Sequence, residues 1–191
     1  MTAAAPASMR AAVLNGARDF RIERRAMPPL QRGHVRIAVE GCGVCASSLP
    51  LWSGRPWFSY PQPPGTPGHE GWGAIVDAAD DVEGWRVGER VVFLSDRAFA
   101  EQDVTCADAI ARIPACAGDR PLPGEPLACS MNVLRRADIQ AGMDVAVVGV
   151  GFIGALLVQL ATSAGARVVA FSRRAWAREV ARGCGATETF G

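Results

Sequence analysis

Three short motifs in the first 126 residues carry side chains of the kinds that can bind metal ions. They are Cys42-Gly43-Val44-Cys45, Gly68-His69-Glu70 and Glu125-Pro126. Thiolate, imidazole and carboxylate are all donors for Zn²⁺, and a site that keeps one open position suits catalysis. No motif is decisive alone, because a lone cysteine or histidine is commonly a packed residue and glutamate before proline commonly begins a helix.

A fourth motif has the spacing of a phosphate-binding turn. Gly149-Val150-Gly151-Phe152-Ile153-Gly154 matches G-x-G-x-x-G. An apolar strand is expected over 144–148, a helix over 152–164 and a second apolar strand over 167–171, and this context favours a dinucleotide-binding turn over a purely structural one.

Each part of this turn has an expected role. Gly149 permits the tight turn, Gly151 lets the backbone approach a pyrophosphate, and Gly154 allows the helix to pack closely on the strand. The first helical turn, with Phe152 and Ile153, offers free N–H groups and a partial positive charge to the phosphates.

The residues at the end of the second strand indicate which dinucleotide is bound. Position 172 lies 23 residues after Gly149, where an NAD-binding turn places an acid on the ribose 2′-hydroxyl. Here the chain has Ser172-Arg173-Arg174, whose hydroxyl and guanidinium groups can donate to a 2′-phosphate. NADP is therefore favoured over NAD, although two arginines on a solvated helix start remain the alternative.

Two kinds of element must position these motifs. The first ~120 residues read as short strands with little helix, which predicts an irregular barrel or sandwich. A loop rich in proline, glycine and aromatic residues is expected between Trp52 and Pro67, either as an apolar plug or as the lining of a substrate cleft. The strands are expected near residues 11–14, 20–23, 35–39, 73–76, 90–94 and 98–104.

Composition excludes several classes of protein. The chain has 191 residues, a formal net charge of +1 and 49% hydrophobic residues, which is ordinary for a globular protein and gives no electrostatic case for nucleic-acid binding. Its longest apolar run is too short and too rich in glycine for a membrane span, and the first residues lack signal-peptide character, so we expect a cytoplasmic protein. Six cysteines in that setting are not expected to form a disulfide framework.

In their order along the chain, these motifs resemble the medium-chain, zinc-type alcohol dehydrogenase family. Gly43-Val44-Cys45, Gly68-His69-Glu70 and Gly88-Glu89-Arg90-Val91 are similar to signatures of that family, and Glu125-Pro126-Leu127 resembles its polyol dehydrogenase branch. The resemblance implies a β-rich GroES-like irregular barrel followed by the first half of a doubly wound α/β (Rossmann) sheet. We expect a catalytic domain over 1–121, a connecting helix over 122–140 and a partial NAD(P)-binding domain over 141–191.

The resemblance also implies residue roles. Cys45, His69 and either Glu70 or Glu125 would hold Zn²⁺, and Ser47 would hydrogen-bond the substrate oxygen and pass its proton. The implied activity is hydride transfer between NADP(H) and a small alcohol, aldehyde or ketone, with no nucleic-acid or membrane partner.

The sequence departs from the family pattern at several positions. Ser48 stands where an acid often supports the zinc-bound histidine, and Pro50 stands where the alcohol branch has a relay histidine. The four-cysteine lobe for structural zinc is absent, and Cys129, four residues after Glu125, is expected to pack.

Several alternatives stay open. Cys42 and Cys45 together are a candidate redox dithiol or structural zinc pair. Two other functions are alternatives to the dehydrogenase: a non-catalytic dinucleotide-binding module, and a metal-free enoyl or quinone reductase of the same superfamily.

The length of the chain predicts an incomplete second domain. About 51 residues follow position 140, too few for a complete doubly wound domain, so we expect a fragment or truncated relative of a longer enzyme with an unfinished sheet edge. Assembly into a homo-oligomer is a further possibility.

Overall fold

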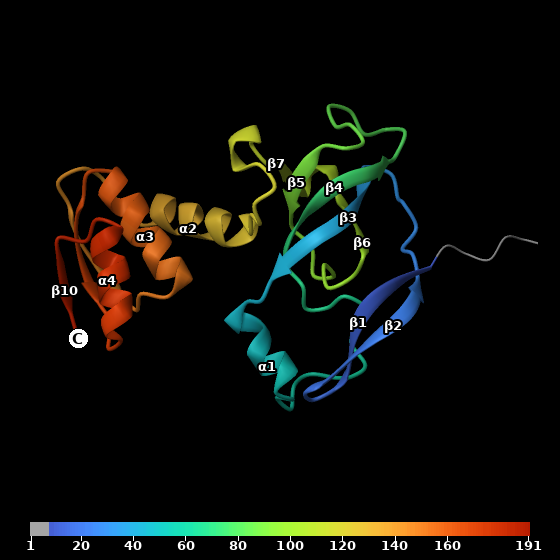
Figure 1. The fold of residues 1–191 in the computed structure, drawn as a ribbon, viewed down its shortest axis with the longest axis horizontal. Coiled ribbons are helices and arrows are strands. Elements are labelled where there is room, and N and C mark those ends of the chain that lie inside the picture. Colours follow the sequence, from blue (N-terminus) through green and yellow to red (C-terminus); the bar gives the residue numbers. More distant parts are fainter. Residues whose placement is uncertain (1–7) are drawn as a thin grey trace, which may run out of the picture. The chain divides into compact units, whose positions relative to one another are not determined.

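In the computed structural model, residues 8–191 are described and fall into two compact units, the first ending at Glu125 and the second running Pro126–Gly191. Figure 1 labels their elements. The strands of the first unit are β1 (Ser8–Gly16), β2 (Asp19–Ala26), β3 (His34–Gly43), β4 (Glu70–Ala78), β5 (Arg90–Phe93), β6 (Gln102–Cys106) and β7 (Ile110–Arg112). Its helical pieces are α1 (Leu49–Trp52) and three short 3-10 turns at Ala46–Ser48, Ala107–Ala109 and Ala115–Ala117.

The first unit is built on two antiparallel sheets. β1 pairs with β2, while the larger sheet has the strand order β6-β3-β4-β5-β7. The larger sheet buries one apolar cluster, consisting of Val35, Ile37, Ile75, Val91, Phe93 and Ala98. Since the buried residues of β3 alternate at Val35 and Ile37, the strand packs one face inward, as its sequence pattern predicts.

One predicted strand is wrong over half its length. Residues 98–104 were expected to be extended and paired, but β6 begins only at Gln102. Ala100 makes only an isolated bridge to Ala11, and the backbone near Ala98 is pressed against Gly68, where an added Cβ would lie 2.5 Å from the Phe99 nitrogen. The backbone hydrogen bonds of residues 98–101 are therefore shared between residues 65–68 and β1, and they do not form one continuous ladder.

The second unit is a three-stranded parallel sheet with helices. Its strands are β8 (Asp144–Val148), β9 (Arg167–Phe171) and β10 (Glu188–Phe190), in the order β10-β9-β8, and its helices are α3 (Phe152–Ser163) and α4 (Ala175–Gly183). Helix α2 (Gly124–Arg136) leads into this unit. Within residues 8–191, β8 pairs only with β9, so its other edge has no strand partner there.

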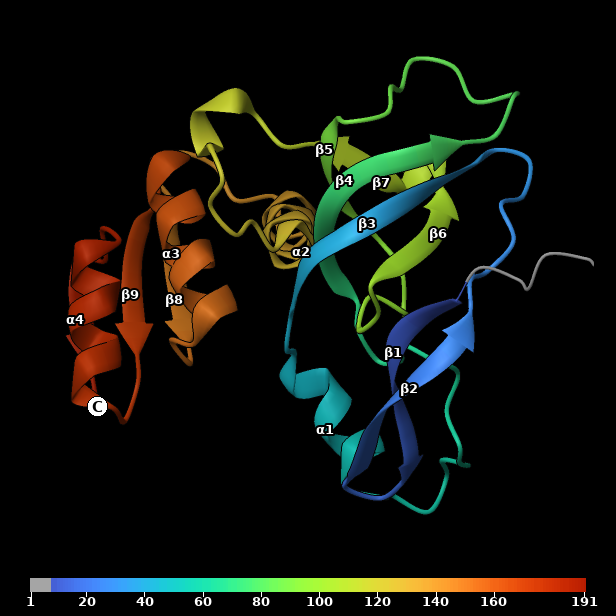
Figure 2. The same cartoon turned by 45° about the vertical axis from the view of Figure 1, so that its right-hand side comes forward.

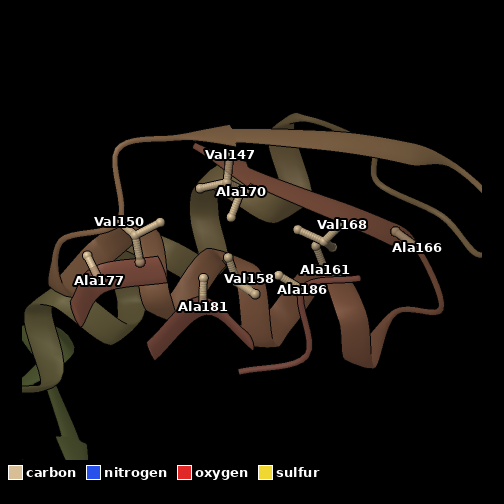
Figure 3. Packing of buried hydrophobic residues seen from close by; sticks show 10 residues of the cluster. All are labelled: Val147, Val150, Val158, Ala161, Ala166, Val168, Ala170, Ala177, Ala181 and Ala186. Atoms are coloured by element: carbon tan, nitrogen blue, oxygen red, sulfur yellow. The ribbon is translucent and has the colours of Figure 1, made fainter. Parts of the chain in front are cut away.

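Helices α3 and α4 pack against this sheet, as Figure 2 shows for α3, α4 and β9. Small and β-branched residues fill the layer between them: Val147, Val150, Val158, Ala161, Ala166, Val168, Ala170, Ala177, Ala181 and Ala186 (Figure 3). Small side chains let helices approach strands closely, and the β-α-β order agrees with the partial doubly wound sheet predicted from the sequence. No helix of residues 8–191 is both long and apolar enough to cross a bilayer.

Candidate functional site

Strand pairing brings the first two metal-binding motifs together. β3 and β4 are antiparallel, with Gly43 opposite Glu70. Cys45 follows the end of β3 by two residues and His69 precedes the start of β4 by one. Because the end of one antiparallel strand lies beside the start of its partner, Cys45 meets His69 and Glu70 at one sheet edge although they lie 24 and 25 positions further along the chain.

The three donor side chains lie close together. One ligand atom each from Cys45, His69 and Glu70 falls within 4.8 Å of the other two. Atoms bonded to one Zn²⁺ at ~2.0–2.3 Å are at most about 4.6 Å apart, so the cluster is near the span that a single ion bridges. The structure therefore gathers Glu70 with the thiol and the imidazole.

The Glu70 carboxylate is the feature that fits a metal best. Glu70 is 8% exposed, yet no residue between 8 and 191 donates a hydrogen bond or forms an ion pair with its carboxylate. Carboxylates with so little exposure are commonly paired or bound to metal. A cation held with Cys45 and His69 would supply the partner that Glu70 lacks within residues 8–191.

Gly43 makes room for this carboxylate. A Cβ at position 43 would lie 1.9 Å from Glu70 Oε2 and 3.0 Å from its Cδ. The glycine of the Gly-Val-Cys turn thus leaves the space that the Glu70 side chain occupies.

The imidazole of His69 is oriented by the backbone. Its Nδ1 lies 3.0 Å from the Pro67 carbonyl oxygen. Since a carbonyl only accepts, Nδ1 carries the proton and Nε2 keeps its lone pair for a ligand bond. Sequence reasoning expected the usual acidic support to be missing, and Ser48 does leave it missing, but the Pro67 carbonyl provides the orientation instead.

Cys42 takes no part in the donor cluster. Its thiol donates to the Gly43 carbonyl at 3.3 Å and packs against the apolar core of the larger sheet. Burial raises the pKa of Cys42 to about 11, with nearby Glu70 and Asp103 adding to the rise against a backbone hydrogen bond from Glu70. A thiol that packs on the core and holds its proton tightly is a poor redox nucleophile, and the position of Cys42 outside the donor cluster argues against the paired-cysteine zinc site.

Glu125 and Ser47 lie at a cavity beside the donors. The cavity has a volume of about 590 Å³ and is lined by Ser47, His69, Leu94, Ser95, Asp96 and Glu125. Glu125 reaches it because Gly124 packs on Val92 of β5, where an added Cβ would lie 2.4 Å from a valine methyl. The structure does not bring Glu125 into the cluster of three donors.

Sequence reasoning missed Leu94, Ser95 and Asp96. β5 runs antiparallel to β4 with Phe93 opposite Gly71, so the residues after Phe93 lie beside those before Gly71. The available signal was the end of the predicted strand at 90–94, because residues that follow neighbouring strands meet at one edge.

The phosphate-binding turn forms a separate candidate site in the second unit. Gly149 has a φ of +93°, a conformation that suits glycine, and a Cβ at Gly154 would lie 2.1 Å from the Gly149 carbonyl oxygen. At Gly151 an added Cβ meets no atom within 4 Å, so the backbone there is open to approach.

A cavity of about 740 Å³ adjoins this turn. It is lined by Val148, Gly149, Val150, Gly151, Phe171, Ser172, Arg173, Arg174 and Gly191. Phe152, Ile153 and Gly154 are not in its lining and form the first turn of α3. No carboxylate side chain is among these lining residues.

The two arginines at this cavity differ in their surroundings. The Arg174 guanidinium lies over the Trp176 ring, 5.7 Å from its centroid, and the Arg174 N–H donates to the Ser172 hydroxyl at 3.4 Å. Arg173 has no hydrogen bond or ion pair from its side chain within residues 8–191.

Comparisons with known proteins agree with this arrangement. Residues 31–120 match the family model for the alcohol dehydrogenase GroES-like domain. The chain is 30% identical to (R,R)-butanediol dehydrogenase of Bacillus subtilis and 28% identical to sorbitol dehydrogenase of Halalkalibacterium halodurans, over 83% and 81% of its length. It spans 56% and 53% of those two relatives.

Among solved structures, a protein described as a zinc-binding dehydrogenase from Sinorhizobium meliloti, bound to NADP, superposes with a TM-score of 0.82. The identity is 28%, and the match covers 96% of this chain and 61% of that one. The first unit is thus a GroES-like domain, and the second unit is part of a Rossmann sheet. This order of domains is that of medium-chain dehydrogenases. Residues 31–120 thus resemble the alcohol dehydrogenase GroES-like domain, and the expected resemblance of the chain to zinc-type dehydrogenases is confirmed.

Proposed function

We propose that this chain provides the metal centre and part of the coenzyme site of a zinc- and NADP-dependent oxidoreductase. The reaction is hydride transfer between NADP(H) and a small alcohol, aldehyde or ketone. The observation that carries the proposal is the buried Glu70 carboxylate, which lies with the Cys45 thiol and the His69 imidazole and has no other partner within residues 8–191.

The residues divide the work at this centre. Cys45, His69 and Glu70 would hold Zn²⁺, which when bound supplies a Lewis acid that polarises a carbonyl or stabilises an alkoxide. The Pro67 carbonyl fixes the tautomer of His69. Ser47 lines the adjoining cavity, where its hydroxyl can accept a proton from the substrate oxygen and pass it to solvent, since Ser47 is exposed.

The preference for NADP rests on the second unit. Ser172 and Arg173 line the cavity beside Gly149 and Gly151, and no lining side chain is an acid that would repel a 2′-phosphate. Arg173 is without an intramolecular partner in the described chain, so its guanidinium is available to an anion. The NADP-bound structural relative supports this choice.

The names of the relatives support the substrate class. Butanediol and sorbitol dehydrogenases are dehydrogenases of small polyhydroxy alcohols, and the chain shares with them most of its own length. We extend that class to this chain on the strength of its polar cavity beside the donors.

Metal analysis of the purified chain tests the proposal. We expect about one zinc per chain, with loss of the metal in Cys45→Ser and His69→Ala and retention in Cys42→Ser. A wild-type chain free of zinc after growth and refolding with the metal refutes the zinc assignment and favours a metal-free reductase or a dinucleotide-binding module.

Coenzyme choice is tested separately by titrating NADPH and NADH against the same chain. NADPH is expected to bind more tightly, and Arg173→Ala to weaken NADPH without weakening NADH. Equal binding of the two coenzymes to the wild-type chain refutes the assignment of Ser172 and Arg173.

A further inference from the structure

The cavity beside the metal donors has an unusual balance of side chains. It holds the hydroxyls of Ser47 and Ser95, the carboxylates of Asp96 and Glu125, one imidazole and one leucine. None of its lining residues is an arginine or a lysine. Apart from the metal donor His69, the polar groups of this cavity are hydroxyls and carboxylates, so they suit ligand groups that carry O–H or N–H donors.

One wall of this cavity, residues 94–97, is tied to the rest of the unit by hydrogen bonds. The Leu94 N–H donates to the Ala109 carbonyl at 2.9 Å, and the Leu94 carbonyl accepts from the Thr105 hydroxyl at 2.7 Å. The Ser95 hydroxyl donates to Asp103 and accepts from the Arg97 N–H at 3.0 Å. Asp96 therefore stands on a backbone that is held on both sides.

The residue that anchors this wall is Asp103, a carboxylic acid whose burial costs free energy. Asp103 lies on β6 with an exposed fraction of 2%, and its carboxyl group accepts from Ser95 and from the Val104 N–H at 2.8 Å. An apolar side chain at a buried strand position avoids the desolvation cost of a carboxyl group. A carboxyl group is present at this buried position because it binds the Ser95 hydroxyl at the cavity wall.

The side chain of Asp96 is exposed. Its carboxylate makes no hydrogen bond or ion pair with any residue between 8 and 191. It also lines a second cavity of about 440 Å³, together with Leu51, Gln62, Pro63, Thr66, Pro67 and Arg97. A group bound beside His69 can thus reach Asp96 without displacing an internal partner.

We propose that Asp96 is a specificity-determining residue, an acceptor carried on an anchored backbone for a second O–H or N–H donor on a substrate whose reacting oxygen lies beside Cys45, His69 and Glu70. The inference rests on the proposed function and deepens it. Small vicinal diols are then preferred to monoalcohols, which lack the second donor, and to α-hydroxy acids, whose carboxylate meets Asp96 and Glu125. Asp103 is a positioning residue that acts through Ser95.

The test uses the chain loaded with Co²⁺ in place of Zn²⁺, because the visible spectrum of Co²⁺ reports ligands at the centre without turnover. We titrate 2,3-butanediol, 2-butanol and lactate. A hydrogen bond to an exposed carboxylate predicts that the diol binds about three- to tenfold more tightly than 2-butanol. Asp96→Ala should abolish that preference, whereas Asp108→Ala, which removes an exposed acid that lines neither cavity, should keep it.

The anchoring role of Asp103 has its own readouts. Asp103→Val should leave Co²⁺ uptake intact, reduce the preference for the diol and accelerate exchange of the Arg97 amide hydrogen, which is bonded to Ser95. Asp103→Asn, which retains polar partners for Ser95 and Val104, should restore both. A change in thermal stability alone would indicate a merely structural residue and overturn the positioning role.

The outcomes separate this inference from the proposed function. A chain that takes up no Co²⁺ refutes both. A chain that takes up Co²⁺ but binds diol and monoalcohol equally, or keeps its preference in Asp96→Ala, refutes the role of Asp96 and leaves the metal centre standing.

Discussion

Replacing Gly43 by alanine tests the geometry of the metal centre most directly. The added Cβ would lie 1.9 Å from Glu70 Oε2, whereas ordinary contact begins at 3.4 Å, so the carboxylate oxygen must retreat by about 1.5 Å. Ligand bonds in metal sites vary by only about 0.2 Å, and a donor displaced that far leaves the coordination shell. Because even residues that only support the ligands contribute 10- to 100-fold to metal affinity, we expect at least about that loss of zinc affinity.

The fold should tolerate this substitution. Gly43 does not have a positive φ, the closest atom is the end of a flexible side chain, and the Glu70 Cβ at 3.0 Å need give by only a few tenths of an ångström. Gly16→Ala is the matched control, because an added Cβ there meets nothing within 4 Å and β1 is remote from the donors in sequence. The assay is competition for Zn²⁺ against a chromogenic chelator, with circular dichroism to verify folding. A folded Gly43→Ala chain with the zinc affinity of the wild type refutes the placement of Glu70 among the donors.

Three further outcomes are expected. Cys42→Ser should retain zinc while Cys45→Ser loses it, measured by metal content after gel filtration; equal losses would restore the paired-cysteine interpretation. Gly154→Ala should destabilise the second unit by about 1–3 kcal/mol, because its Cβ meets a carbonyl oxygen of the backbone, and thermal unfolding should show no such loss for Gly151→Ala, which instead weakens NADPH binding. Burial raises the pKa of Asp103, so the folded chain holds its proton more tightly than the unfolded chain; that contribution to stability is present below about pH 4 and is lost as pH rises through the folded pKa. The melting temperature of Asp103→Asn should therefore rise relative to that of the wild type as the pH increases from 4 to 7, while Cys42, Asp96 and Arg97 still face the site. A melting-temperature difference that does not change with pH would contradict the raised pKa of Asp103.

Local signals sufficed for the second unit. The strand, turn and helix around Gly149 were predicted within a residue or two, because apolar runs, glycines and helix length all act over short stretches of chain. The β-rich character of the first unit was equally visible in its alternating residues.

The choice of donors depended on information that the sequence does not display. Glu70 and Glu125 were equal candidates, and only the β3–β4 register, with Gly43 opposite Glu70, brings one of them to Cys45 and His69. The Pro67 carbonyl was equally invisible, since every residue has a carbonyl and only the folded backbone aims one at Nδ1.

The prediction of a strand over residues 98–104 was wrong for a related reason. Its composition suits an extended segment, but the ladder position is taken by close contact with the backbone of Gly65 and Gly68. Such tertiary contacts override an intrinsic preference for strand.

The register of β3 with β4 has a consequence for how this scaffold can vary. The connection between Gly43 and Glu70 is closed by ladder hydrogen bonds, so its exposed tip near Trp57 can gain or lose residues at a small entropic cost, whereas residues 65–68 are packed on the backbone of residues 97–99 and cannot. A slip of one position along the ladder, by contrast, turns Glu70 to the opposite face and disassembles the trio at once. Insertions at that tip are thus a safe way to reshape what this chain recognises, while a one-residue shift in strand pairing is not.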